Sequence, residues 1–280
     1  MLAVLGMVIV ASCSSSGASS TASEARPGAP RTAVVSTAAT TSTATARTSA
    51  AAAHSKNAAL PLAGKVVGID PGHNGRNYTD PAFLNHQIWN GHNEEGCDTT
   101  GTQTDSGYTE AQFNFNVATY LTADLRAEGA KVVLTRKTND GIGPCVNERA
   151  WIINRAHSDV AIDIHADGGP PGGRGFAILE PVPDGPNDHV ISASERFARI
   201  LRARYSTVTS MPVSTYDGVD GFQPRFDLAG LNLTTVPKVL IECGNMRNAT
   251  DAELLVRSSF QRRAARAFTE AIRLYLTGRD

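Results

Sequence analysis

The 280-residue chain lacks the features that mark several large classes of protein. Its formal net charge is only −1, so nothing in the composition points to a nucleic-acid-binding protein. After the first dozen residues, no apolar run is long enough to span a bilayer. HExxH and CxxC motifs are absent, and the glycine-rich stretch 168–175 lacks the Gly-Lys-Ser/Thr ending of a phosphate-binding loop. The informative signal therefore lies in single residues that follow predicted strands.

The N-terminal 62 residues differ in composition from the rest of the chain. Residues 1–11 form a short apolar run that predicts a signal peptide over residues 1–13, although a basic start is missing. The sequence before Cys13 resembles a lipobox, so we expect either a lipid anchor on this cysteine or ordinary secretion. Residues 14–62 are rich in Ala, Ser and Thr and poor in large apolar side chains, which predicts a disordered tether. Both alternatives predict an exported protein, in the periplasm, in the cell wall or outside the cell.

From residue 63 to residue 278, strand-like and helix-like patterns alternate. We expect strands at 65–70, 131–135, 159–164, 175–180 and 237–242, and helices at 109–128, 146–157, 191–205 and 250–277. Alternation of this kind predicts a single α/β domain with a twisted, mostly parallel (mixed) sheet and helices on both faces. The segment 71–108 is expected to be a long polar loop.

Ionisable side chains come at the ends of three predicted strands. His73 follows the Pro-Gly turn after the first strand, His165 follows strand 159–164, and Glu242 ends strand 237–242. In open α/β sheets, active sites are built at the C-terminal ends of the strands. Glu110 opens the helix that follows the first strand, at the same edge of the sheet, where the helix dipole favours a carboxylate. These four side chains can therefore converge.

Two histidines and two carboxylates suit a hydrolytic zinc site. A catalytic zinc usually takes three protein ligands and leaves a position open. We assign His73, Glu110 and His165 as ligands of one zinc ion. Glu242 is left as the catalytic residue, a general base that takes a proton from the attacking water and passes it to the leaving amine. The chemistry that this set predicts is hydrolysis of an amide.

Two aspartates lie beside these ligands on the same strands. Asp70 and Asp163 are expected to support the site from outside, by hydrogen bonding to a ligand histidine or to a loop.

Three cysteines follow the predicted signal segment. Cys97 and Cys145 both lie in loop-like sequence, so we expect these two to form a disulfide in an oxidising compartment. Cys243 directly follows Glu242 and is expected to be a small buried residue; a catalytic thiol is the weaker alternative because no basic neighbour is evident.

The motifs together resemble a known family. Gly68-Ile69-Asp70-Pro71-Gly72-His73, Glu110 at a helix start, Ile164-His165-Ala166-Asp167 and Val239-Leu240-Ile241-Glu242-Cys243-Gly244-Asn245-Met246 are similar to the zinc-dependent N-acetylmuramoyl-L-alanine amidases of the amidase-3 type, in matching order. The resemblance implies peptidoglycan or its muramoyl-peptide fragments as substrate. The bond cut would join N-acetylmuramic acid to the L-alanine of the stem peptide. It also implies the zinc ligands and catalytic glutamate assigned above.

Two other readings of the same site stay open, as do the roles of two long segments. A zinc peptidase acting on wall peptides would have the same ligands, and a wall-binding module could retain the fold without turnover. Loop 74–106 is either a surface loop or a wall of the substrate groove. The segment 183–236 contains either a core-packed helix or a helix that covers the zinc and awaits a partner. We expect the protein to be a monomer.

Overall fold

The computed structural model describes residues 59–279. The predicted signal peptide, the lipobox at Cys13 and nearly all of the predicted tether concern residues outside this range. Within the described part, no helix has the length and apolar character needed to cross a membrane. The hydrophobic core begins with Leu62, which is fully buried one residue before the predicted start of the domain.

A six-stranded mixed sheet forms the centre of the domain. Its strands, in spatial order, are β4 (Lys131–Leu134), β1 (Val66–Pro71), β5 (Val160–Asp167), β8 (Lys238–Asn245), β6 (Ala177–Pro181) and β7 (Phe222–Arg225). The first four strands are parallel, β6 runs antiparallel to β8, and β7 is parallel to β6. Almost every residue of β1, β5 and β8 is buried, as expected for central strands covered on both faces.

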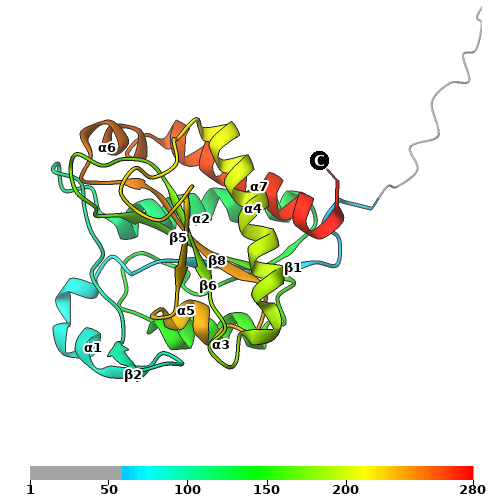
Figure 1. Ribbon diagram of the computed structural model, residues 1–280, viewed down its shortest axis with the longest axis horizontal. Helices are drawn as coiled ribbons and strands as arrows, with labels where there is room; N and C mark the ends of the chain where they lie inside the picture. Colours follow the sequence, from blue (N-terminus) through cyan, green and yellow to red (C-terminus); the bar gives the residue numbers. More distant parts are fainter. Residues whose placement is uncertain (1–58, 280) are drawn as a thin grey trace, which may run out of the picture. The chain divides into compact units, whose positions relative to one another are not determined.

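Helices cover both faces of this sheet. The helices are α2 (Glu110–Ala127), α4 (Ile191–Thr209) and α7 (Ser258–Thr277) on one face, and α3 (Val146–Arg155) and α5 (Ala229–Asn232) on the other. In Figure 1 the sheet runs between these two layers. The larger layer supplies most of the core, where aromatic side chains such as Phe113, Phe197 and Phe268 are fully buried. The predicted fold class, a single α/β domain with a mostly parallel mixed sheet, is confirmed.

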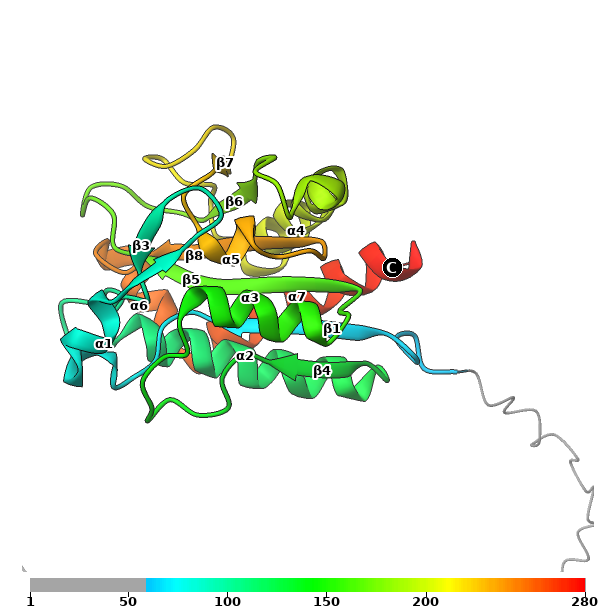
Figure 2. The same cartoon turned by 90° about the horizontal axis from the view of Figure 1, so that it is seen from below.

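Residues 71–108, predicted as one irregular loop, contain several short elements. These are a 3₁₀ turn at Asn77–Thr79, helix α1 (Pro81–Asn85) and a hairpin of β2 (Gln87–Trp89) and β3 (Glu94–Gly96). Figure 2 shows the hairpin and α1 at the end of the sheet where β1 and β5 terminate. The sequence prediction missed them because each element is only three to five residues long, too short for a hydrophobic period to show.

The predicted helix 250–277 is in fact two helices. Helix α6 (Ala249–Leu255) ends before Arg257, whose ψ of 125° is extended, and α7 starts at Ser258. The break lets α6 stay beside β8 while α7 packs along α2 and α4. Strand β7 and helix α5 were not predicted, since each is a four-residue element within the long segment 183–236.

Helix α4 is the principal element of that long segment. Its buried side chains include Phe197, Leu201 and Tyr205, and it packs mainly against α7. This agrees with the expectation of a core-packed helix and places α4 away from the strand ends that carry the candidate site.

The sequence pattern places His165 just after a strand and Glu242 at the end of one, but in the structure both residues lie inside strands. Strand β5 continues two residues past His165, and β8 continues three residues past Glu242. His165 and Glu242 are direct partners in the parallel pairing of these strands, and the register shifts immediately after His165. Both side chains therefore leave neighbouring strands at the same level.

Candidate active site

A cavity of about 420 Å³ lies at the C-terminal ends of β1 and β5. Its walls include all four residues predicted to form the site, together with two that were not predicted. These six residues are His73, Asp98, Glu110, His165, Arg225 and Glu242. Six residues between Glu95 and Thr102 also line the cavity, so part of the long segment after His73 forms a wall of this cavity.

Two glycines let the backbone approach the site closely. A Cβ atom added to Gly72 would lie 2.1 Å from Cε1 of His165, and one added to Gly101 would lie 2.6 Å from Cδ2 of His73. Neither position can therefore carry a side chain without moving a histidine. His73 itself adopts a left-handed φ of 57°, a conformation that is uncommon for residues other than glycine.

Glu110 lies between the two histidines. Its Oε1 is 2.7 Å from Nδ1 of His165, and its Oε2 is 3.3 Å from Nε2 of His73. The carboxylate is 4% exposed in the first turn of α2, where the helix dipole favours a negative charge. The predicted convergence of these three residues is thus present in the structure.

The outer ring nitrogens of both histidines also face carboxylates. Nδ1 of His73 is hydrogen-bonded to Asp98 Oδ1 at 3.0 Å, and Nε2 of His165 lies 3.3 Å from Asp163 Oδ1. Each ring therefore has an aspartate on one side and Glu110 on the other, but only Asp98 makes a hydrogen bond to its histidine; Asp163 Oδ1 is close to His165 without one. Such support from a carboxylate is typical of histidines that ligate metals.

Electrostatics in this cluster favour the charged forms. Burial opposes ionisation of Glu110, but the two histidines outweigh it and hold the pKa of the carboxyl well below its usual value. Burial likewise opposes protonation of His73, yet Glu110 and Asp98 raise its pKa to about 9. The pKa of His165 is also raised, by Asp163 and Glu110 against the effect of burial.

Eight ionisable groups form a closed circuit of ion pairs around the site. The contacts run through His73, Asp98, Arg149, Asp70, Lys238, Asp163, His165 and Glu110, and back to His73, with separations between 2.7 and 3.3 Å. Four carboxylates face two permanent cations, so the circuit carries a charge of −2 when both histidines are neutral. Two protons, or one divalent cation, balance this charge.

The donor set fits a divalent metal ion such as zinc. The ligand atoms of His73, Glu110 and His165 lie within 4.8 Å of one another. Imidazole and carboxylate are suitable zinc ligands, and the charge deficit of the circuit matches one divalent ion. A second group of potential ligands, at His86, Cys97 and Cys145, is different because its two sulfur atoms are bonded to each other.

Glu242 lies in the same cavity and has one unsatisfied oxygen. Among the described residues, Oε2 of Glu242 is buried and has no hydrogen-bond partner. Burial raises the pKa of Glu242 well above its usual value; the charges of Glu110 and Asp167 add to this, while His165 opposes it. An unpaired buried carboxyl is costly, so this oxygen is available for a water molecule or a reacting group.

The two aspartates predicted to support the site have different surroundings. Asp163 faces His165, as expected, whereas Asp70 contacts neither histidine. Asp70 instead accepts hydrogen bonds from Arg149, Lys238 and Thr135. The aspartate that bonds the ring of His73 is Asp98. The sequence pattern did not identify it because it lies in a loop without a hydrophobic period. Its position directly after Cys97, a residue of the predicted disulfide, was the one sequence feature that could have indicated it.

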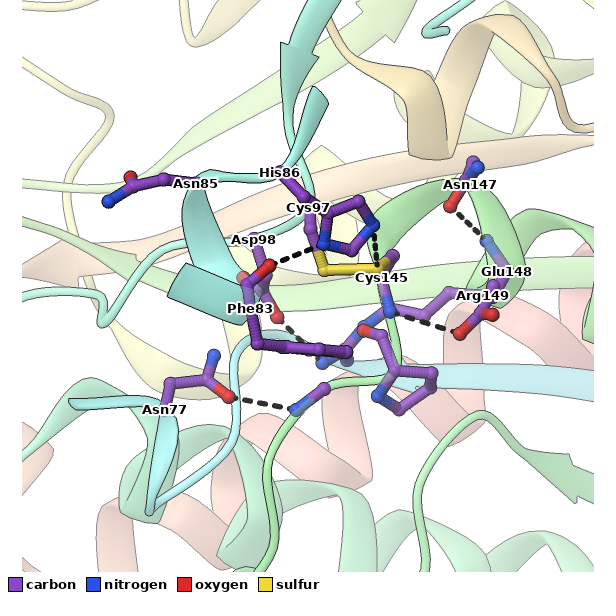
Figure 3. Close-up of a disulfide and its surroundings, with 12 residues drawn as sticks. Asn77, Phe83, Asn85, His86, Cys97, Asp98, Cys145, Asn147, Glu148 and Arg149 are labelled. Atoms are coloured by element: carbon purple, nitrogen blue, oxygen red, sulfur yellow. Dashed lines mark hydrogen bonds and ion pairs between the residues drawn. A yellow bond between two sulfur atoms is a disulfide. The ribbon is translucent and has the colours of Figure 1, made fainter. Parts of the chain in front are cut away.

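The predicted disulfide between Cys97 and Cys145 is present (Figure 3), with the two Cα atoms 4.5 Å apart. The bond fastens the segment after β3 to the N-terminus of α3. His86, a member of the second group of potential metal ligands, lies beside this disulfide, with its Nε2 3.5 Å from Cys145 Sγ. His92 lies elsewhere and pairs with Asp184. Cys243 is a free buried cysteine, as expected.

The fold and the cavity indicate an α/β enzyme with a candidate metal site, and comparison with known proteins gives the family. The profile of Amidase_3, N-acetylmuramoyl-L-alanine amidase, matches residues 67–273. The chain therefore belongs to the Amidase_3 family of N-acetylmuramoyl-L-alanine amidases, which confirms the family and the enzyme class predicted from the motifs.

Mycobacterial proteins are among the most similar relatives. The chain is 38% identical over 216 residues to the N-acetylmuramoyl-L-alanine amidase Rv3717 of Mycobacterium tuberculosis, which covers 77% of this chain and 88% of that protein. The crystal structure of the N-acetylmuramyl-L-alanine amidase Ami1 from Mycobacterium smegmatis has a TM-score of 0.73 and 38% identity, over 78% of this chain and 99% of that one. The corresponding enzyme of Mycobacterium abscessus gives a TM-score of 0.72 at 37% identity, over 77% of this chain and 100% of that one.

Removal of the disulfide should destabilise the domain. Its cysteines are 48 residues apart, so C97S/C145S should lower the free energy of unfolding by about 4 kcal/mol in the chain-entropy model. Urea unfolding of the protein and of the variant measures this difference. A reducing agent should lower the stability of the unmodified protein and leave the variant unchanged, because Cys243 forms no disulfide. Equal stability of all samples would show that the bond has no such role.

Proposed function

We propose that this protein is a zinc-dependent amidase that hydrolyses the bond between N-acetylmuramic acid and the L-alanine of the peptidoglycan stem peptide. The observation that carries the proposal is the arrangement of His73 and His165. Each histidine has an aspartate beside one ring nitrogen and Glu110 beside the other, in a cavity that also contains Glu242. The family of the chain supports the substrate.

His73, Glu110 and His165 would hold the zinc ion. When bound, zinc polarises a carbonyl oxygen and lowers the pKa of a water molecule. Asp98 would keep the imidazole of His73 oriented through its hydrogen bond, and the charge of Asp163 would favour the present orientation of His165. The rest of the circuit compensates the charge of both aspartates through Arg149 and Lys238.

Glu242 would carry the proton during hydrolysis. Its pKa is raised by burial, and a neighbouring divalent cation would favour the ionised form, which brings the carboxyl toward the range useful at neutral pH. Its unsatisfied Oε2 would accept a proton from the attacking water and return it to the alanine amine as the amide breaks. This exchange leaves Glu242 as it began.

The place of action follows from the same proposal. A peptidoglycan amidase works outside the cytoplasm, so residues 1–13 would serve as a signal peptide, and Cys13 would be a site for a lipid anchor. Residues 14–62 would then be a tether for the catalytic domain 63–278, and the domain would act as a monomer.

Digestion of a muramoyl-peptide tests the reaction. We expect a free lactyl carboxylate and a free L-alanine amine by mass spectrometry, loss of both after chelation, and recovery on addition of zinc. Cleavage inside the stem peptide would instead identify a peptidase. Binding of wall fragments with no new amine would identify a wall-binding module.

Glu242→Gln should separate catalysis from metal binding. The substitution keeps the size of the side chain and removes its proton-accepting form, so kcat should fall by on the order of 10²–10⁴-fold. Zinc content should stay at that of the unmodified protein. Glu180→Gln is a suitable control, because Glu180 lies on β6 and burial raises its pKa too, but it does not line the cavity. Unchanged turnover in Glu242→Gln would exclude this role.

Zinc binding should release protons and strengthen as the pH rises. In the metal-free protein the pKa of His73 is raised to about 9, so at pH 7 this histidine is protonated and must lose its proton to bind a metal. Apparent affinity should therefore increase by up to about tenfold per pH unit per displaced proton below pH 9. Calorimetric titration with zinc in buffers of different ionisation enthalpy measures the number released. Affinity that is constant between pH 6 and 8 would contradict the expectation.

A further inference from the structure

Arg149 is a buried residue of α3 whose guanidinium group is fully satisfied. Its side chain is 2% exposed. The group has five N–H donors, and the structure gives each an acceptor. These are the carbonyl oxygens of Pro144, Pro71 and His73 and the carboxylates of Asp70 and Asp98, at 2.8 to 3.2 Å.

Three of these acceptors lie around His73, the first of the three candidate metal ligands in the sequence. The carbonyls of Pro71 and His73 lie on either side of Gly72, in the turn that delivers His73 to the cavity. The third is Asp98, which uses Oδ1 for the ring of His73 and Oδ2 for Arg149. Arg149 therefore contacts both the backbone of His73 and the carboxylate that orients its ring.

The disulfide holds the two partners of the Asp98–Arg149 pair in place, as Figure 3 shows. Asp98 directly follows Cys97, and the backbone N–H of Arg149 donates to the carbonyl of Cys145 one turn earlier in α3. The backbone of Val146 also donates to the carbonyl of Cys97 at 2.8 Å. These bonds fix the backbone from which both side chains of the pair extend.

We propose that Arg149 is a positioning residue for His73, acting on its backbone directly and on its ring through Asp98. Lysine cannot replace it, because an ammonium group has three donors and no planar fork. The inference rests on the proposed binding of zinc by His73, Glu110 and His165, and it adds a determinant of metal affinity outside the ligands themselves.

Arg136 provides a matched control within the same turn. It is also buried and also donates to the carbonyl of Pro71, at 2.8 Å, and to that of Gly72, at 3.2 Å. In the described part of the chain, no hydrogen bond or ion pair joins Arg136 to Asp98 or to the ring of His73. A comparison of Arg149→Lys with Arg136→Lys therefore separates orientation of the ring from general support of the turn.

The test is the affinity of the full-length protein for zinc, measured by competition with a chromogenic chelator. Arg149→Lys should weaken binding about 10- to 100-fold, and Arg136→Lys should change it by less than about 3-fold. Histidine ring ¹⁵N spectra of the zinc-loaded proteins should show a shifted His73 Nδ1 signal in Arg149→Lys alone. Wild-type affinity and an unshifted signal in Arg149→Lys would overturn the inference.

Asp98→Asn provides an independent test if Arg149→Lys does not fold. It interrupts the same contact at the carboxylate and should weaken zinc binding over the same range. Where both variants fold, the effect of the double variant should be clearly smaller than the product of the two single effects, because Arg149 acts on the ring of His73 through Asp98. Independent, multiplying effects would contradict the inference. Failure of the unmodified protein to bind zinc would instead refute the proposed function.

Discussion

The charge balance of the buried circuit is the constraint on which the site depends. Four carboxylates lie out of water beside only two permanent cations, Arg149 and Lys238. Isolated buried charges are very costly, so such a cluster persists only if its members are paired and hydrogen-bonded. The circuit satisfies this condition by alternating the sign of its members. The remaining negative charge of the circuit can be balanced at the two histidines, either by protons on the imidazoles or by a metal ion bound to them.

This arrangement joins the candidate metal site to the hydrophobic core. Lys238 is the first residue of β8 and Asp70 lies near the end of β1, yet both belong to the same set of ion pairs as the histidines. The parallel strands bring these residues together because β5 lies between β1 and β8. The central strands therefore provide both the hydrophobic core and the charges that support the ligands.

The sequence was sufficient to predict the parts of the site that follow from strand and helix periodicity. His73, His165 and Glu242 come from three buried strands, and Glu110 opens a strongly periodic helix, so their meeting at one edge could be expected. Asp98 could not be identified in this way, because its place depends on a loop fixed by a disulfide and a short hairpin. Arg149 could not be identified either, since a charged residue in an amphipathic helix is normally expected at the surface.

The reversal of chain direction at β6 also shapes the rim of the cavity. Because β6 runs against β8, its first residue, Ala177, pairs with Glu242. The segment 168–176 connects the end of β5 to the start of β6. Both of its ends therefore lie beside the candidate site. Tyr216 packs over Gly169 and Gly173 of this segment and donates a hydrogen bond to Asp167, a residue of the cavity wall. The rim next to Glu242 thus includes this segment, which is held by side-chain hydrogen bonds: Asn245 donates to the carbonyls of Pro170 and Gly173, and the backbone N–H of Gly175 donates to Asp251. An insertion or deletion in this segment would therefore change the rim of the cavity, while the paired residues of β5, β8 and β6 keep their register.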